Sequence, residues 1–251
     1  MSSSQFKFIV GPQKKEFTIH AALVAHQSKA LDRLVNGDMK EAQEQCALLE
    51  ATDEQTFIRF SQYVYTGDYY GAEHQQSEPT LSEPRRSLCR PSEHQDHHAN
   101  IWGKQQPQQP SLWDEFKGLY PNPAPHPAST VDNSGDGSYA EVFFSHARLY
   151  VFADYYAIDT LRSLCLCKIH RILVAFPFKE EKIGDIVQLV RYCYENTADQ
   201  GDEVVSLRTL VNMYTACKVE HLWRSDDFQS LLETTGEYSR GLVGEIIRRL
   251  K

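Results

Sequence analysis

The sequence predicts an α+β protein in which a small unit of short strands and clustered helices is followed, after a long polar segment, by an all-helical region. Three observations support this prediction. Residues 6–70 change from the strand period of two to the helix period, and residues 71–138 are rich in proline, glutamine and histidine. From residue 139 the apolar side chains recur at spacings of three and four, as they do on amphipathic helices.

The first unit opens with a predicted hairpin. Residues 6–10 alternate between apolar and polar side chains and then become apolar, which is typical of a strand. Gly11 and Pro12 interrupt this pattern, and residues 16–19 resume it. Because turn-forming residues separate the two runs, we expect them to pair as antiparallel strands.

Helices and a third strand complete the unit. Residues 21–25 favour a short buried helix, and Ser28 is a suitable cap for a second helix that ends at Gly37. Residues 46–49 then predict a third strand. The pair at 52–53 can cap a last helix, whose apolar face comprises Phe57, Phe60, Val64 and Tyr65.

Three stretches of this unit resemble the BTB/POZ domain. They read FTIHAALVAHQS over residues 17–28, GDMKEA over residues 37–42 and YVYTGDY over residues 63–69. The likeness is closer to the version found in many uncharacterised fungal BTB proteins, and it becomes loose after residue 139. This resemblance implies a BTB/POZ fold that acts as a protein-interaction module and has no chemistry of its own.

Met39 and Glu41 are the candidate partner-binding residues of this unit. Residues 39–41 read Met-Lys-Glu and resemble the hydrophobic-x-Glu motif through which some BTB adaptors engage the cullin-3 scaffold. In such a motif the apolar side chain enters a pocket of the partner, and the carboxylate makes a polar contact at the rim. The alternative is a surface loop in which Glu41 is solvated and Met39 folds onto its own domain.

Residues 71–138 are expected to form a disordered insertion, because their composition cannot bury enough apolar surface to offset the chain entropy. An apolar island at 111–120 interrupts this segment, with Ser111 as a suitable helix cap. Its large aromatic residues, Trp113 and Phe116, either bind another protein or dock on the chain's own helices. We favour self-docking, because the apolar face is wider than a minimal binding motif needs; it comprises Leu112, Trp113, Phe116, Leu119 and Tyr120.

Residues 139–251 predict successive helices that complete or extend the first unit. One runs from residue 159 to near 175, where Pro177 follows it, and Asp202 and Glu203 favour the start of a later one. The predicted apolar faces are, in order, Phe143, Phe144, Ala147, Tyr150, Val151 and Tyr155; Leu161, Leu164, Cys165, Ile169, Ile172 and Leu173; Ile183, Ile186, Val187, Val190 and Tyr194; Val204, Leu207, Leu210, Val211, Tyr214 and Cys217; and Leu242, Val243, Ile246, Ile247 and Leu250.

The sequence lacks the short motifs whose spacing indicates catalysis or cofactor binding, such as GxGxxG, the P-loop, GxSxG, HExxH and the EF-hand loop. We therefore expect no enzyme activity, no catalytic residue and no cofactor. Cys165 and Cys167 are two residues apart and point to different sides of a helix, so they predict core thiols rather than metal ligands. The remaining candidates lack the paired spacing of structural zinc sites; they are Cys89, His94, His97 and His98.

Charge and hydropathy limit the cellular compartments and the classes of binding partner that the sequence allows. The formal net charge is −8, and none of the three segments is basic, so we expect no direct binding to nucleic acid. No apolar run approaches the roughly 20 residues of a membrane span, and residues 1–5 do not resemble a secretory signal. We expect a cytoplasmic or nuclear protein whose six cysteines are reduced.

The leading hypothesis is a protein that binds other proteins, and its specific form is a substrate adaptor for a cullin-3 ubiquitin ligase. The alternative is a transcription-linked BTB scaffold with no ligase role. Dimeric BTB proteins usually carry an extra strand and helix before the first hairpin, and they exchange these elements. Because only residues 1–5 precede Phe6, we expect a monomer rather than a swapped dimer.

Overall fold

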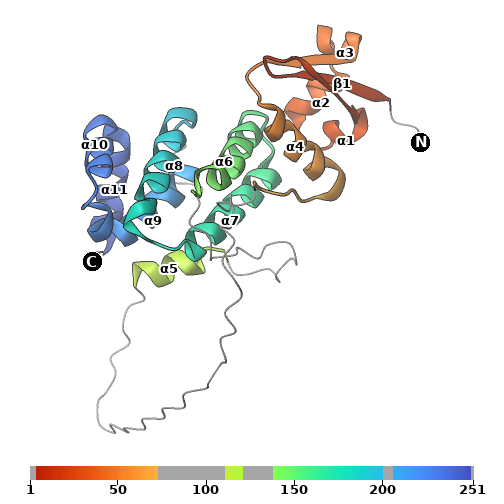
Figure 1. The fold of residues 1–251 in the computed structure, drawn as a ribbon. Coiled ribbons are helices and arrows are strands. Elements are labelled where there is room, and N and C mark those ends of the chain that lie inside the picture. The colour runs from red at the N-terminus through yellow and green to blue at the C-terminus, as the bar shows by residue number, and fades with distance from the viewer. Residues whose placement is uncertain (1–3, 73–110, 121–137, 200–205, 250–251) are drawn as a thin grey trace, which may run out of the picture.

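The computed structural model describes residues 4–72, 111–120, 138–199 and 206–249. Within these ranges the protein is a mixed α+β structure that is mostly helical and contains a three-stranded sheet. The sheet lies at the N-terminal end of the molecule, and the helices after residue 138 are arranged beside one another away from it (Figure 1). The predicted α+β class is therefore confirmed.

The sheet has the strand order β2-β1-β3. Strand β1 (Gln5–Val10) pairs antiparallel with β2 (Lys15–His20), as the hairpin prediction requires, and parallel with β3 (Cys46–Leu49). Gly11 has a φ of 71° in the turn after β1, a conformation that glycine adopts without steric cost. One face of the sheet is apolar and buried; it comprises Phe6, Phe8, Val10, Ile19, Ala47 and Leu49.

The predicted helices of this unit are held at their ends by the expected residues. Ser28 Oγ accepts a hydrogen bond from the Leu31 N–H at 3.1 Å, and the Asp53 carboxylate accepts one from the Thr56 N–H at 2.9 Å. Gly67 ends the last helix in the left-handed conformation, with a φ of 74°. The three helices are α1 (Ala21–Ala25), α2 (Lys29–Asn36) and α4 (Glu54–Thr66).

The structure adds a short helix, α3 (Lys40–Glu44), where one of the two sequence interpretations places a surface loop. The residues of α3 are mostly polar and have no apolar period, so no pattern predicts this helix. Met39 begins it through its backbone carbonyl oxygen, which accepts hydrogen bonds from the N–H groups of Ala42 and Gln43 at 3.1 and 3.2 Å.

Aromatic rings connect the sheet to the helical region. Phe57 on α4 lies 5.1 Å from Phe8 on β1, measured between ring centroids, and Phe60 lies 4.8 Å from Phe152. Phe152 belongs to α6 (Ala140–Tyr155), and all four rings are buried. Aromatic side chains remove large apolar areas from water, so the N-terminal unit and the helical region share one core.

One helix of the helical region agrees with the prediction at both ends. The helix predicted from residue 159 to near 175 is α7 (Asp159–Ala175), and Phe176 is extended before Pro177, as the residue before a proline usually is.

Among the described helices, none has both the length and the hydropathy needed to cross a membrane. The other elements are the short 3₁₀ helix η1 (Glu180–Lys182), α8 (Ile183–Asn196), α9 (Leu207–Leu222), α10 (Asp226–Thr234) and α11 (Gly236–Arg249).

The start of α9 differs from the prediction. Ser206 caps this helix by accepting a hydrogen bond from the Thr209 N–H at 3.2 Å, so the described helix begins after it. Asp202, Glu203 and Val204, which the prediction places at this terminus, lie outside the described residues. Helix α10 has no counterpart among the predicted helices.

Three predicted apolar faces need correction. On α4, Phe57, Phe60 and Val64 are buried, but Tyr65 is 51% exposed. Tyr155, at the end of α6, is 80% exposed. On α11, Leu242 is buried and Ile246 packs partly against the core, whereas Val243 and Ile247 are about half exposed, at 53% and 51%. Val243 directly follows Leu242, and Ile247 directly follows Ile246. Successive residues of a helix are turned by about 100°, so Val243 and Ile247 point away from the contact with α9. Leu250 lies outside the described residues.

The apolar island forms helix α5 (Leu112–Gly118), and Ser111 caps it as predicted, with its Oγ 3.2 Å from the Asp114 nitrogen. Helix α5 packs against α9 (Figure 1). Ala72, which the sequence assigns to the insertion, is bound to α6, because its N–H donates to Ser145 Oγ at 3.0 Å. The rest of the predicted insertion, at 73–110 and 121–137, lies outside the described residues.

Candidate protein-binding surface

Met39 projects from the start of α3 with 59% of its surface exposed. The chain reaches this position through a tight exit from α2 at Gly37, where an added Cβ would lie 2.3 Å from the carbonyl oxygen of Arg33. Only glycine permits this approach of backbone to backbone. Because 59% of its surface is exposed, the Met39 side chain is not folded onto its own domain, as the alternative interpretation requires.

Glu41 lies in the first turn of α3 and is partly buried. Its neighbour Lys40 forms an ion pair with Glu44 at 3.5 Å, one helical turn away. Within the described part of the chain, the Glu41 carboxylate has no hydrogen-bond or ion-pair partner. Its charge is thus available to a donor on another molecule.

A hollow of about 320 Å³ adjoins α3 and the exposed face of the sheet. Its apolar floor comes from Ile9 on β1 and Leu48 on β3, which are paired in the sheet register. Leu48 is 51% exposed. Charged side chains surround this floor, and the complete lining is Ile9, Lys14, Lys40, Glu41, Glu44, Cys46 and Leu48.

We call Met39, Glu41 and the floor residues Ile9 and Leu48 the α3 surface. Sequence reasoning identified Met39 and Glu41 but not the floor. The missing signal is the period of two in the third strand: Ala47 and Leu49 face the core, so Leu48 must face outward. Leu48 and Ile9 therefore lie side by side on the outer face of the sheet.

Comparison with known proteins provides no further assignment for this surface. No model of a protein family matches the chain, and no curated protein matches it.

Trp113 and Phe116 are not brought together with the α3 surface. Phe116 is fully buried against His170 on α7 and Tyr214 on α9, at 4.8 and 5.6 Å between ring centroids. Trp113 stacks on Phe116 at 5.5 Å and is partly buried. The favoured self-docking of the island agrees with this arrangement. While α5 is docked, Phe116 is not accessible to a partner protein.

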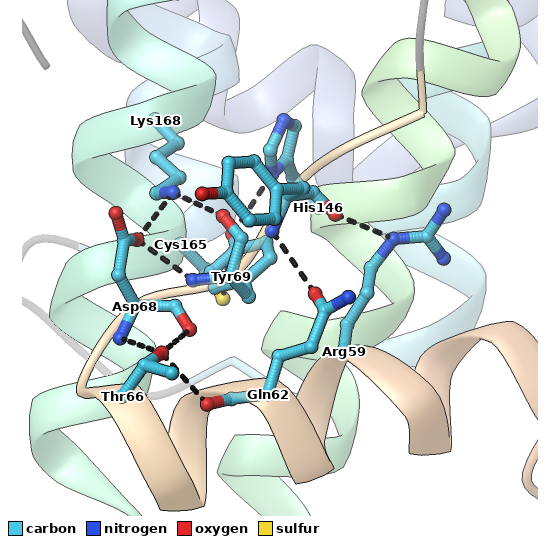
Figure 2. Close-up of polar contacts among 9 residues, drawn as sticks. Arg59, Gln62, Thr66, Asp68, Tyr69, His146, Cys165 and Lys168 are labelled. Carbon is cyan, nitrogen blue, oxygen red and sulfur yellow. Dashed lines mark hydrogen bonds and ion pairs between the residues drawn. The ribbon is translucent and has the colours of Figure 1, made fainter. Parts of the chain in front are cut away.

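A cluster of buried and partly buried polar side chains joins the chain after α4 to α6 and α7 (Figure 2). Tyr69 Oη lies 2.8 Å from His146 Nδ1 and 3.3 Å from Cys165 Sγ. Lys168 Nζ lies 2.5 Å from both the Tyr69 carbonyl oxygen and the Asp68 carboxylate. The five side chains come from three segments that are far apart in the sequence: residues 68–69, α6 and α7. This cluster is therefore a product of the tertiary fold.

The buried cysteine and histidine of this cluster are not poised for nucleophilic catalysis. Burial, with a smaller contribution from the charge of Lys168, lowers the pKa of His146 to about 3, so its imidazole is neutral. Burial raises the pKa of Cys165 to about 12, so its sulfur remains a thiol. Nucleophilic cysteines require the opposite shift, toward the thiolate. The cluster therefore fits a structural role.

Cys165 and His170, both on α7, contact other parts of the protein. Cys165 is bound to Tyr69, and His170 Nε2 lies 2.6 Å from the Phe116 carbonyl oxygen. Among the described residues, no group of three or more His, Cys, Asp or Glu side chains is arranged to hold a metal ion. Cys89, His94, His97 and His98 lie outside the described residues. The free thiols of the described chain are Cys46, Cys165, Cys167, Cys193 and Cys217.

Proposed function

We propose that this chain is a protein–protein interaction module whose N-terminal unit is a BTB/POZ domain, and that the α3 surface binds the N-terminal helical region of cullin-3. The observation that carries the proposal is the exposure of Met39 at 59%, two residues before a carboxylate that has no partner among the described residues. In this role the protein is a substrate adaptor for a ubiquitin ligase.

The chemistry of the α3 surface supports this function. Transfer of a methionine side chain from water to a partner's apolar pocket contributes about 1.5 to 3 kcal/mol, and methionine adapts its shape to irregular pockets. The neighbouring Leu48 adds exposed apolar area, and Glu41 supplies a charge at the edge of the contact. An apolar anchor with a polar rim is the arrangement found at the centres of protein interfaces.

Calorimetric titration with a cullin-3 N-terminal fragment tests the proposal. Met39→Ala is expected to weaken binding by roughly 2 kcal/mol, and Glu41→Ala by about 0 to 1 kcal/mol, because buried anchors contribute more than exposed charges. Val243→Ala is a matched control, since Val243 is also about half exposed but lies on α11. A wild-type chain that releases no heat at high micromolar concentration would end the adaptor proposal.

A further inference from the structure

Helix α5 is attached to its own protein by the contacts of a docked peptide. Its aromatic pair, Trp113 and Phe116, lies on α7 and α9, and its chain connections run through residues 73–110 and 121–137. Among residues 111–120, Phe116 is the one that is fully buried. A helix of this length has little stability in isolation, so the surface beneath it provides its order.

Charge complements the apolar contact. Lys218 Nζ on α9 lies 4.1 Å from the centroid of the Trp113 ring, at a cation–π distance. An Arg248 nitrogen on α11 lies 3.9 Å from a Glu115 carboxylate oxygen. The surface therefore presents cations to an acidic helix with two aromatic residues three positions apart. We call His170, Tyr214, Lys218 and Arg248 the α5-docking surface.

Two buried polar atoms of this surface have no hydrogen-bond partner among the described residues. A carbonyl oxygen only accepts hydrogen bonds, so His170 Nε2–H must donate to Phe116, and in the neutral ring Nδ1 is then an acceptor. Neither His170 Nδ1 nor Tyr214 Oη has a hydrogen-bond partner among the described residues, although both side chains are at least 98% buried. Buried polar groups without a partner cost free energy.

We propose that the α5-docking surface is a binding site for a short amphipathic helix of another protein, one that carries an aromatic pair at positions i and i+3 and an acidic first turn. Helix α5 is the chain's own occupant, which such a helix replaces. This site shares no residue with the α3 surface and does not depend on cullin-3 binding. The protein then has a second binding surface in addition to the α3 surface, and α5 occupies this second surface until a partner helix replaces it.

Competition between the two occupants is open to measurement. A tethered segment acts at an effective concentration on the order of 1 mM. For a peptide with an intrinsic Kd of roughly 50 μM, the docked α5 then raises the apparent Kd about 20-fold. Removal of the α5 aromatic residues should restore the intrinsic affinity.

The probe is a fluorescein-labelled peptide with the sequence of residues 111–120, and its anisotropy is measured with the full chain. We expect the Trp113→Ala/Phe116→Ala variant to bind it at least tenfold more tightly than the wild type. A peptide with alanine at both aromatic positions should not bind. In the variant background, Lys218→Ala should weaken binding at least threefold, whereas Lys29→Ala, on the exposed part of α2, should not.

Three outcomes would overturn the proposal. The first is a variant that retains its helical circular dichroism but shows no peptide binding up to 1 mM. The second is equal affinity for the peptide without aromatic residues. The third is a wild-type dimer that the double substitution dissociates, because the surface would then belong to α5 of a second copy.

Hydrogen exchange of the wild-type chain provides a test that needs no variant. If α5 is exchangeable, the amides of Glu115 and Leu119 should exchange at least 100-fold faster than that of Tyr214, after correction for intrinsic rates. Equal protection would show that α5 leaves its surface only when the whole protein unfolds. The proposal would then be wrong.

Discussion

The hydroxyl of Tyr69 lies 2.8 Å from Nδ1 of His146, at the point where the chain leaves α4 and meets α6. Both side chains are buried, and 77 residues separate them in the sequence. The same hydroxyl contacts Cys165 on α7, so one tyrosine connects three segments (Figure 2). This bond fixes the N-terminal unit to the helical region by a polar contact inside the shared core.

Tyr69→Phe should lower the free energy of unfolding by about 1 to 3 kcal/mol, because it leaves His146 Nδ1 buried without its partner. Tyr70→Phe is the matched control. Tyr70 is 68% exposed, and its substitution should change stability by less than about 0.5 kcal/mol. Urea denaturation followed by circular dichroism provides both values. Equal stability of the two variants would show that the buried bond contributes nothing.

The neutral state of His146 predicts acid sensitivity. Its pKa is about 3 in the folded protein, below the ordinary value of 6.5, so the unfolded chain binds the proton more tightly. The stabilisation is fully present above pH 6.5 and is lost as the pH falls from 6.5 toward 3. Between pH 7 and pH 4 the loss is at most about 3 kcal/mol, at 1.36 kcal/mol per pKa unit.

The acid sensitivity is measured as the difference between wild type and His146→Gln, which cancels the titration of all other groups to first order. The charged groups that act on His146 are Lys168, Arg59 and Asp68. Stability should fall more steeply with acid in the wild type than in the variant. Parallel curves between pH 7 and pH 4 would contradict a buried neutral imidazole.

Gly71→Ala tests how tightly this region is packed. An added Cβ would lie 2.5 Å from His146 Nε2 and 3.2 Å from Ser145 Oγ. Tyr69 holds the imidazole in place, so the clash should cost about 1 to 3 kcal/mol of stability. Gly184→Ala meets nothing within 4 Å on α8 and should instead stabilise by about 0.5 to 1 kcal/mol. Thermal unfolding distinguishes these opposite signs.

Phe116→Ala separates a docked segment from a permanent part of the core. If α5 is exchangeable, the substitution loses at most the free energy of docking, which is about 2 kcal/mol for a 20-fold docking equilibrium. Phe143→Ala, at an equally buried position on α6, should cost about 3 to 5 kcal/mol. Equal losses in urea denaturation would place Phe116 in the permanent core.

Local signals account for much of the secondary structure. Ser28 and Asp53 begin helices because a side-chain oxygen close in sequence binds a free N–H group, and this interaction needs no tertiary contact. The period of the apolar residues between 159 and 175 likewise predicts α7, and Pro177 predicts where it ends. Helix α3 has no such period, so the sequence does not predict it. The structure identifies it by the hydrogen bonds that the Met39 carbonyl oxygen accepts from the first turn.

By itself, the sequence determined the α+β class, most of the helices and strands, the aromatic island at 111–120 and the candidate pair Met39 and Glu41. Only the tertiary structure decided that Met39 is exposed, that Leu48 forms the floor of a hollow, and that Phe116 is buried between α7 and α9. The reason is the range of the interactions. Caps and periods act within a few residues, whereas exposure depends on which distant segments pack together.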